Sequence, residues 1–244
     1  MPWDFWLIFA VLGVILPWRG RARLQKLLAE PRLSGRDRLA LYASTIAFQW
    51  LLTLVAAWRA HSRGLSWADL GLLHLGRAQN LIAATVGAAA LASLQWLNLR
   101  RMGRTKGRAP ALMRQLAERI FPQSRKELAL YLLLSLTAGL CEEFLYRGFV
   151  MAALAQVGLP AWTVVLLSSI LFGLAHLYQG RGGFVSTLVI GTVFGTARIS
   201  YDALVPEMAW HTAFDAVAGL VGPRYLLRAE ESAGAAEAHS IAEK

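Results

Sequence analysis

The sequence predicts an all-helical, multi-pass transmembrane bundle of about seven (six to eight) helices. Three observations lead to this fold class. Hydrophobic residues make up 56% of the 244 residues and charged residues only 16%, and the mean hydropathy is +0.45. The apolar residues fall into long runs, and the runs are separated by short polar or basic stretches. This pattern is typical of one membrane-embedded bundle and not of several soluble domains.

Seven apolar segments are the expected helices: 3–18, 39–58, 80–99, 128–157, 161–178, 184–199 and 203–221. A helix needs about 20 residues to cross a bilayer, and tilt accommodates shorter or longer ones. The first segment has neither a basic n-region nor a small-residue cleavage site, so we expect a retained helix and not a signal peptide. Gly191 and Gly195 form a G-x-x-x-G pattern that favours close approach of another helix.

The basic residues give a net charge of +10 and gather in two blocks, 19–38 and 100–126. Basic stretches between apolar segments indicate cytoplasmic loops, whose partners are anionic membrane lipids. This placement argues against a nucleic-acid partner, because the charge does not form one basic face. It puts the N-terminus outside and the C-terminus inside.

The segment 128–157 contains three charged residues in an otherwise apolar run: Glu142, Glu143 and Arg147. Each such group costs about 2.5 to 3.5 kcal/mol at a bilayer centre, so each needs a partner or a function. Glu143 and Arg147 are four residues apart, which favours a side-chain ion pair on a helix. Glu142 points about 100° away and stays free. One alternative is that all three only hold the bundle together as buried polar groups.

Two further apolar segments carry ionisable groups at helical spacing. Phe172 and His176 share one helix face, as do His211 and Asp215. Membrane burial turns such groups inward, towards one another or a water-filled cavity. A carboxylate that accepts a proton from water, imidazoles that orient the water or bind a metal, and a polar group facing an oxyanion make a hydrolytic site. Zinc also accepts two histidines and a carboxylate, so a metal-bound and a metal-free water are both open.

Other nucleophiles fit less well. Cys141 is the one cysteine, and it therefore forms neither an intrachain disulfide nor a cysteine-based zinc site. A thiol in apolar surroundings is usually inert. Ser168 and Ser169 lack a G-x-S-x-G context and are expected to bond to helix backbone.

Three motifs in separate apolar segments carry a family resemblance, in this order: Glu142-Glu143-x-x-x-Arg147, Phe172-x-x-x-His176 and His211-x-x-x-Asp215. In this arrangement the chain resembles the CPBP family of CAAX proteases and bacteriocin-processing enzymes, also called Abi proteins. The eukaryotic prenyl-protein endopeptidase of the Ras-converting type is similar. The motifs span 142–215, about a third of the chain.

The resemblance implies an intramembrane endopeptidase that acts on membrane-associated or C-terminal, CAAX-like peptides. In such families the residues matching Glu142 and His176 activate the attacking water. Those matching His211 and Asp215 stabilise the oxyanion or complete a metal site. Glu143, Arg147 and Phe172 are then supporting residues around these four.

The implied cofactor is either zinc or none. A zinc ion would use Glu142, His176, His211 and Asp215 as candidate ligands, whereas a metal-free mechanism would use a glutamate-activated water. The better-known CAAX proteases carry asparagine where this chain has Asp215. An amide can donate a hydrogen bond to an oxyanion, but an ionised aspartate can only accept one. Asp215 therefore favours a metal-ligand or histidine-orienting role.

On this interpretation the chain divides into three parts. Residues 1–127 supply N-terminal transmembrane helices and basic cytoplasmic loops, 128–221 form the catalytic core, and 222–244 form a polar, disordered tail. We expect an integral protein of a bacterial cell membrane with a peptide or membrane-protein substrate; the substrate's identity, its prenylation and the oligomeric state stay open.

Two other functions also fit the sequence. One is a non-enzymatic immunity or scaffold protein, and the other is a proton-coupled transporter in which Glu142, His176 and His211 relay protons. One geometric difficulty also remains. Counted at 1.5 Å per residue from the expected helix starts, Glu142 and His176 lie at different levels of the bilayer.

Overall fold

The structure, a computed structural model, describes residues 1–30, 32–104 and 111–227. Within these ranges the regular structure is helical and contains no strand; its α, π and 3-10 elements join into eight continuous helices. Five of the helices are long and apolar enough to cross a membrane: Trp3–Ala29, Gly35–Ser62, Ala78–Arg104, Arg125–Ala155 and Leu177–Tyr201. A shorter apolar helix covers Ala161–Ala175. The prediction of an all-helical, multi-pass integral membrane protein is confirmed.

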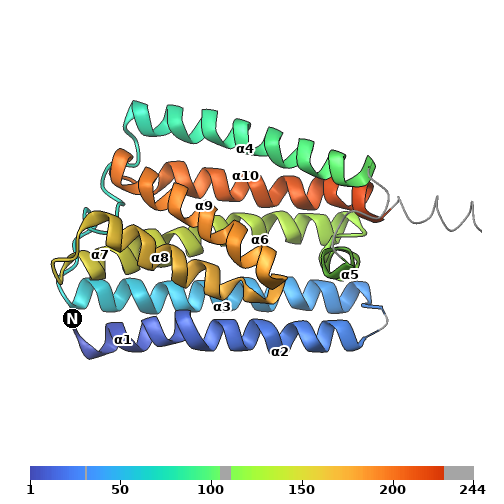
Figure 1. The fold of residues 1–244 in the computed structure, drawn as a ribbon, viewed down its shortest axis with the longest axis horizontal. Helices are drawn as coiled ribbons and strands as arrows, with labels where there is room; N and C mark the ends of the chain where they lie inside the picture. The colour runs from blue at the N-terminus through green and yellow to red at the C-terminus, as the bar shows by residue number, and fades with distance from the viewer. Residues whose placement is uncertain (31, 105–110, 228–244) are drawn as a thin grey trace, which may run out of the picture.

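The helices follow one another along the chain, and the longest connection described, 63–77, joins α3 to α4 (Figure 1). Their bounds are α1 (Trp3–Ala10), η1 (Val11–Ile15), α2 (Leu16–Ala29), α3 (Gly35–Ser62), α4 (Ala78–Arg104), α5 (Ala111–Ile120), α6 (Arg125–Glu143), η2 (Phe144–Val150), α7 (Met151–Ala155), α8 (Ala161–Ala175), η3 (Leu177–Gln179), α9 (Gly180–Tyr201), α10 (Val205–Gly222) and η4 (Pro223–Leu227). The elements η1, η2 and η4 are π-helical stretches that continue neighbouring α-helices without a break, and η3 is a single 3-10 turn.

Four long helices lie side by side in the order α4, α10, α6 and α3 (Figure 1). The first helix, formed by α1 and α2, lies on the other side of α3 (Figure 1). Helices α8 and α9 pack on each other. The N-terminus lies at the opposite end of the bundle from α5 and the described end of α10 (Figure 1). Each of the seven apolar segments corresponds to a helix, but 128–157, 161–178 and 203–221 include a few positions outside the helices. Helix α5 is an additional short helix. The last helix continues to Leu227, and the rest of the expected tail, 228–244, lies outside the described residues.

The first basic block lies mostly in helices and not in a loop. Arg19, Arg21, Arg23 and Lys26 belong to α2, which continues to Ala29. Arginine and lysine are good helix formers, and their long stems can lie along apolar surface while the charges reach water. The helix therefore passes beyond the end of the apolar run, and a basic helical end replaces the expected loop.

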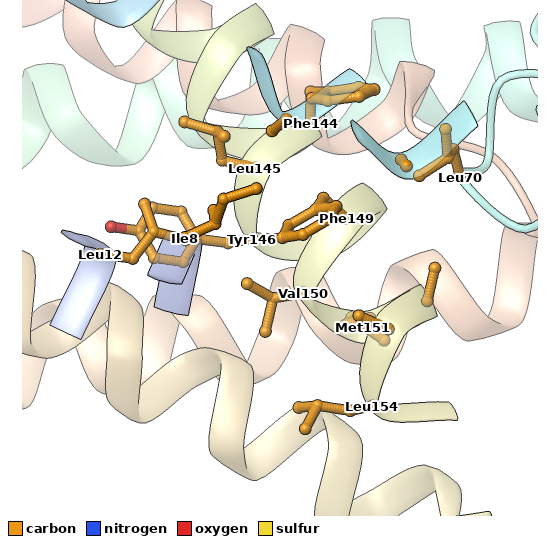
Figure 2. Packing of buried hydrophobic residues seen from close by; sticks show 14 of the residues in the cluster. Ile8, Leu12, Leu70, Phe144, Leu145, Tyr146, Phe149, Val150, Met151 and Leu154 are labelled. Atoms are coloured by element: carbon orange, nitrogen blue, oxygen red, sulfur yellow. The ribbon is translucent and has the colours of Figure 1, made fainter. Parts of the chain in front are cut away.

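The main core surrounds the second half of the Arg125–Ala155 helix. Figure 2 shows Phe144, Phe149 and Leu154 from η2 and α7 packed with Ile8 and Leu12 of the first helix. The rings of Phe5 and Phe149 meet edge to face, with centroids 4.9 Å apart. Because this helix contacts α3, α10, α8 and the first helix, it is the central element of the bundle.

A buried ion pair fixes α3 against the start of α6. Arg38 donates from Nε to Glu127 Oε2 at 2.8 Å and from a terminal nitrogen to Oε1 at 3.2 Å. The backbone N–H of Gln123 donates to the same carboxylate at 2.8 Å. Tyr42 donates its hydroxyl to the carbonyl of Ile120. These bonds satisfy charges that would otherwise be costly to bury.

The G-x-x-x-G pattern of α9 faces α8. A Cβ at Gly191 would lie 3.2 Å from Ser169 Cα, and one at Gly195 would lie 3.0 Å from Val165 Cγ1. Both distances are at the limit of real contacts, so the two glycines let the helices approach closely. The predicted packing role of this pattern is confirmed.

Gly139 has the same function between α6 and α10. A Cβ there would lie 2.8 Å from the carbonyl oxygen of Met208 and 2.9 Å from the backbone nitrogen of Thr212. Backbone cannot move aside as a side chain can, so any larger residue pushes the two helices apart.

We predict that Gly139→Ala destabilises the protein by about 1 to 3 kcal/mol through overpacking. Thermal unfolding of the purified protein in detergent measures this. Gly182→Ala is the control, because nothing lies within 4 Å of a Cβ at that position. Equal melting temperatures for the two variants would contradict the tight α6–α10 contact.

Candidate active site

The Glu143 carboxylate lies at the centre of the site and is fully buried. Its Oε1 accepts a hydrogen bond from Arg147 Nη1 at 3.1 Å, as the four-residue spacing predicts. The same oxygen lies 2.7 Å from His211 Nδ1. Because an ionised carboxylate only accepts, Nδ1 of His211 carries the proton. This leaves His211 Nε2 directed away from Glu143.

Arg147 links this pair to α8 and α9. Its guanidinium carbon lies 4.3 Å from the ring centre of Phe172 and 5.6 Å from that of Phe194. A guanidinium over an aromatic face is stabilised electrostatically, and more strongly when it is desolvated. Gly191 makes room for it, since a Cβ there would lie 3.2 Å from Arg147 Nη2. Phe172 therefore contributes to the site by packing its ring against Arg147.

The π-helical stretch η2 begins directly after Glu143. Such stretches free backbone carbonyls from the regular helix ladder and are frequent at functional sites. Here Ser168 of α8 donates to the Tyr146 carbonyl at 2.7 Å. Ser169 donates to Val165 within its own helix at 2.7 Å. Both serines bond to backbone, which confirms the expectation for them.

His176 lies at the C-terminal end of α8 and is the residue that caps it. Its Nδ1 lies 2.8 Å from the carbonyl oxygen of Phe172. A carbonyl oxygen only accepts, so Nδ1 carries the proton and Nε2 has a free lone pair when the ring is neutral. The backbone of α8 thus fixes both the orientation and the tautomer of this ring.

Glu142 and His176 reach the same level because their helices share one connection. Glu142 lies 13 residues before Ala155, where α7 ends, and His176 lies 15 residues after Ala161, where α8 begins. At 1.5 Å per residue these are about 20 and 22 Å from that connection. The expected difference in depth disappears when both helices are counted from the end that they share.

Glu142 faces the two imidazoles. Its Oε1 accepts a hydrogen bond from Gln49 Nε2 of α3 at 2.7 Å. Its Oε2 has no hydrogen-bond partner in the described part of the chain, and it lies 3.9 Å from the Nε2 atoms of both His176 and His211. Asp215 Oδ2 lies 3.6 Å from His211 Nε2. The four candidate catalytic side chains therefore converge from α6, α8 and α10.

Two residues near the site were missed in the sequence. Gln49 interrupts an apolar segment as the charged residues do, but nothing in the sequence places it beside Glu142. Glu207 lies four residues before His211, so its position on the same face was a usable signal. Its carboxylate is fully buried, has no hydrogen-bond partner among the residues described, and interacts electrostatically with Glu143 and Arg147.

The types of the four converging side chains suit zinc, but their arrangement does not. In the ranges that the structure describes, no group of three or more His, Cys, Asp or Glu residues is placed to hold a metal ion. Zinc ligands lie about 2.0 to 2.2 Å from the ion for nitrogen and oxygen. As they stand, these residues do not fit a bound ion, and the zinc site stays a prediction.

Removing Glu143 should destabilise the protein strongly, because Arg147 is then buried without a counter-charge. We expect Glu143→Ala to lower the free energy of unfolding by about 3 to 5 kcal/mol. Chemical unfolding in detergent measures this value. Glu118→Ala is the matched control, since its ion pair with Arg119 is long, at 3.7 Å, and exposed, and such pairs contribute about 0 to 1 kcal/mol. Similar losses in both variants would refute a structural role for Glu143.

Comparison with known families identifies the segment that carries this site. Residues 124–217 match the family described as "Type II CAAX prenyl endopeptidase Rce1-like". Comparisons with curated proteins and with solved structures give no match. The matched segment begins one residue before α6 and ends within α10, so it encloses all three motifs. The match of this segment implies an intramembrane peptidase with a peptide substrate. Residues 124–217 therefore form an Rce1-like CAAX prenyl endopeptidase domain of the CPBP/Abi type.

Proposed function

We propose that this protein is an intramembrane endopeptidase in which Glu142 is the general base. It hydrolyses a peptide bond of a membrane-associated or C-terminal, CAAX-like peptide. The observation that carries the proposal is the free Oε2 of Glu142, 3.9 Å from the Nε2 atoms of both histidines. Polar atoms at this separation are too far apart for a direct hydrogen bond, but one water molecule bridges such a distance.

Each residue around Glu142 prepares it for this role. Gln49 donates to Oε1 and so directs Oε2 towards the histidines. The neutral His176 ring has its proton on Nδ1, held by the Phe172 carbonyl, and its Nε2 accepts a hydrogen bond from the attacking water. Glu142 Oε2 then removes the water's other proton as the oxygen attacks the carbonyl carbon. The same carboxyl group returns the proton to the leaving amine.

His211 supports the developing oxyanion. Its Nδ1 donates to Glu143, so a proton on Nε2 makes the ring a donor towards the substrate oxygen. The positive charge of that ring is offset by Glu143 on one side and by Asp215, at 3.6 Å, on the other. Preorganised donors of this kind contribute about 2.7 to 4 kcal/mol to transition-state stabilisation. Asp215 thereby acts through His211 and does not contact the oxyanion.

The free carboxylate oxygen also separates this proposal from its rivals. Buried polar groups that serve only packing are normally hydrogen-bonded, as the Arg38–Glu127 pair is. Other buried polar atoms near the site, those of Glu207 among them, also lack a partner in the described residues. Glu142 Oε2 differs from them because it faces two imidazole Nε2 atoms, each 3.9 Å away. This arrangement favours a reactive group over a scaffold protein.

We place the protein in a bacterial cell membrane with the basic end of the bundle in the cytoplasm. The end that carries α5 and the C-terminal half of α2 holds the described residues of both basic blocks (Figure 1), and basic ends favour the cytoplasmic side. Residues 128–221 serve as the catalytic core. The helices before residue 128 contribute to it directly, since Gln49 of α3 holds Glu142.

We predict that Glu142→Gln lowers the rate of peptide cleavage by about 100- to 10,000-fold, because it removes the general base and keeps the shape of the side chain. The assay uses the purified protein in detergent with a library of membrane-anchored and C-terminal peptides, and products are detected by mass spectrometry. Glu118→Gln, outside the site, is the matched control and should keep wild-type activity.

Two outcomes would change this interpretation. If the wild type is folded and cleaves no peptide in a broad library, the scaffold function replaces the hydrolase. A zinc chelator provides the second test. A glutamate-activated water predicts unchanged cleavage with chelator, and loss that added zinc restores would show that a metal takes part.

Asp215→Asn tests the aspartate that stands where the better-known CAAX proteases have asparagine. In our proposal the negative charge stabilises the protonated His211, so its removal should lower kcat about tenfold with little change in KM, since 1.4 kcal/mol corresponds to a factor of ten. Steady-state kinetics of both proteins measure this. A higher kcat in the variant would mean that a donor is needed at this position and that Asp215 does not act through His211.

A further inference from the structure

A cavity of about 270 Å³ leads from the site towards the basic end of the bundle. Its walls come mainly from α2, α3, α5 and α6, and most of the side chains that line it are apolar, eight of them leucines. Glu142, Tyr146 and His176 line it as well. Two arginines of α2, Arg19 and Arg23, also line it. The cavity therefore joins the candidate general base to two arginines through an apolar interior.

The two arginines differ in how they are held. Arg23 donates to Ser44 Oγ at 2.7 Å and to Thr45 Oγ1 at 3.1 Å, so its guanidinium ties α2 to α3. Arg19 packs its guanidinium carbon 4.5 Å from the ring centre of Phe48. Phe48 precedes Gln49, which donates to Glu142. Arg19 of α2 therefore packs against the stretch of α3 that positions Glu142.

Neither arginine has an acidic partner. Among the described residues, no carboxylate lies within ion-pair distance of Arg19 or Arg23, whereas Arg38, Arg59, Arg147 and Arg198 each have one. Glu142 is the one acidic residue in the cavity wall, and Gln49 already holds it. The positive charge of Arg19, at an exposed position, is available to a ligand. A guanidinium pairs with a carboxylate through two parallel hydrogen bonds.

We propose that Arg19 binds a carboxylate of the substrate, and that the cavity takes an apolar peptide segment between this carboxylate and the bond at Glu142. This inference rests on the proposed function, because the bound peptide is a substrate only if the protein is a peptidase. The carboxylate has two chemical sources, a free C-terminus or an acidic side chain. An anionic lipid headgroup is the competing occupant. Arg21 and Lys26 lie on the same helix but do not line the cavity, so they attract lipid without reaching the site.

The test measures binding without turnover, in the full-length chain carrying Glu142→Gln. Fluorescence anisotropy in detergent compares three apolar peptides of one sequence: a C-terminal acid, the C-terminal amide, and the amide with one internal aspartate. We expect the acid to bind about tenfold more tightly than the amide, which corresponds to one charge-assisted pair. Adding Arg19→Gln should abolish this preference, so that the acid binds about as weakly as the amide, and should leave binding of the amide unchanged.

Arg21→Gln is the matched control and should keep the full preference. Arg19→Lys should retain part of it, because a lysine keeps the charge and loses the planar fork. Tight binding of the aspartate peptide would assign the subsite to an acidic side chain, and weak binding would assign it to the C-terminus.

Equal binding of all three peptides would overturn the proposal, as would an equal effect of Arg19→Gln and Arg21→Gln. Displacement of the acid peptide by phosphatidylglycerol but not by phosphatidylcholine, with no difference between acid and amide, would identify the lipid as the occupant. An acid preference that depends on Arg19, in a protein whose wild type cleaves no peptide, would keep the binding site and remove the hydrolase.

Discussion

The buried carboxylate of Glu143 is the interaction on which the site depends. It compensates Arg147, which is fully buried, and it holds the imidazole of His211 at 2.7 Å. Arg147 in turn packs on Phe172, and the backbone of Phe172 fixes His176. One carboxylate on α6 therefore connects the reactive side chains of α8 and α10. Without it, neither histidine would be held towards Glu142 by the same set of contacts.

Such a buried ion pair is not an efficient source of stability. Desolvating two charges offsets much of their attraction, and an apolar pair of the same shape is often as stable. What the pair provides is orientation, because each partner can bond in few geometries. The adjacent glutamates thus have separate tasks. Glu143 Oε1 is bonded to both Arg147 and His211, whereas Glu142 directs its Oε2 towards two imidazoles.

The features that depend on local spacing could be predicted from the sequence. The Glu143–Arg147 pair and the bond of Ser169 to the Val165 carbonyl follow from positions within a single helix. The G-x-x-x-G spacing of α9 likewise indicated a close helix contact, but not that its partner is α8. Contacts between distant segments could not be predicted in this way. Gln49 is 93 residues from Glu142, and no periodicity links them. The continuation of α2 through the basic block was also missed, because apolarity marks the membrane part of a helix and not its end.

The candidate site residues were found because a charge is conspicuous in an apolar segment. Glu207 fits the same rule and was not predicted, although it lies in the apolar segment 203–221 four residues before His211. Its buried carboxylate is a second acidic group, besides Glu143, that interacts electrostatically with Arg147. The convergence of the motifs in space is a property of the whole bundle, and only the structure provides it.

The shared connection between α7 and α8 has a consequence for how this chain tolerates changes of length. Glu142 and His176 are level because each is counted from that connection, over 13 and 15 residues. One residue inserted within either helix would rotate the side chains beyond it by about 100° and move them by about 1.5 Å. The same insertion in the connection, 156–160, would leave both counts unchanged. Among relatives that keep this chemistry, variation in length is therefore expected between the two motifs at the connection and not within the helices that reach the site.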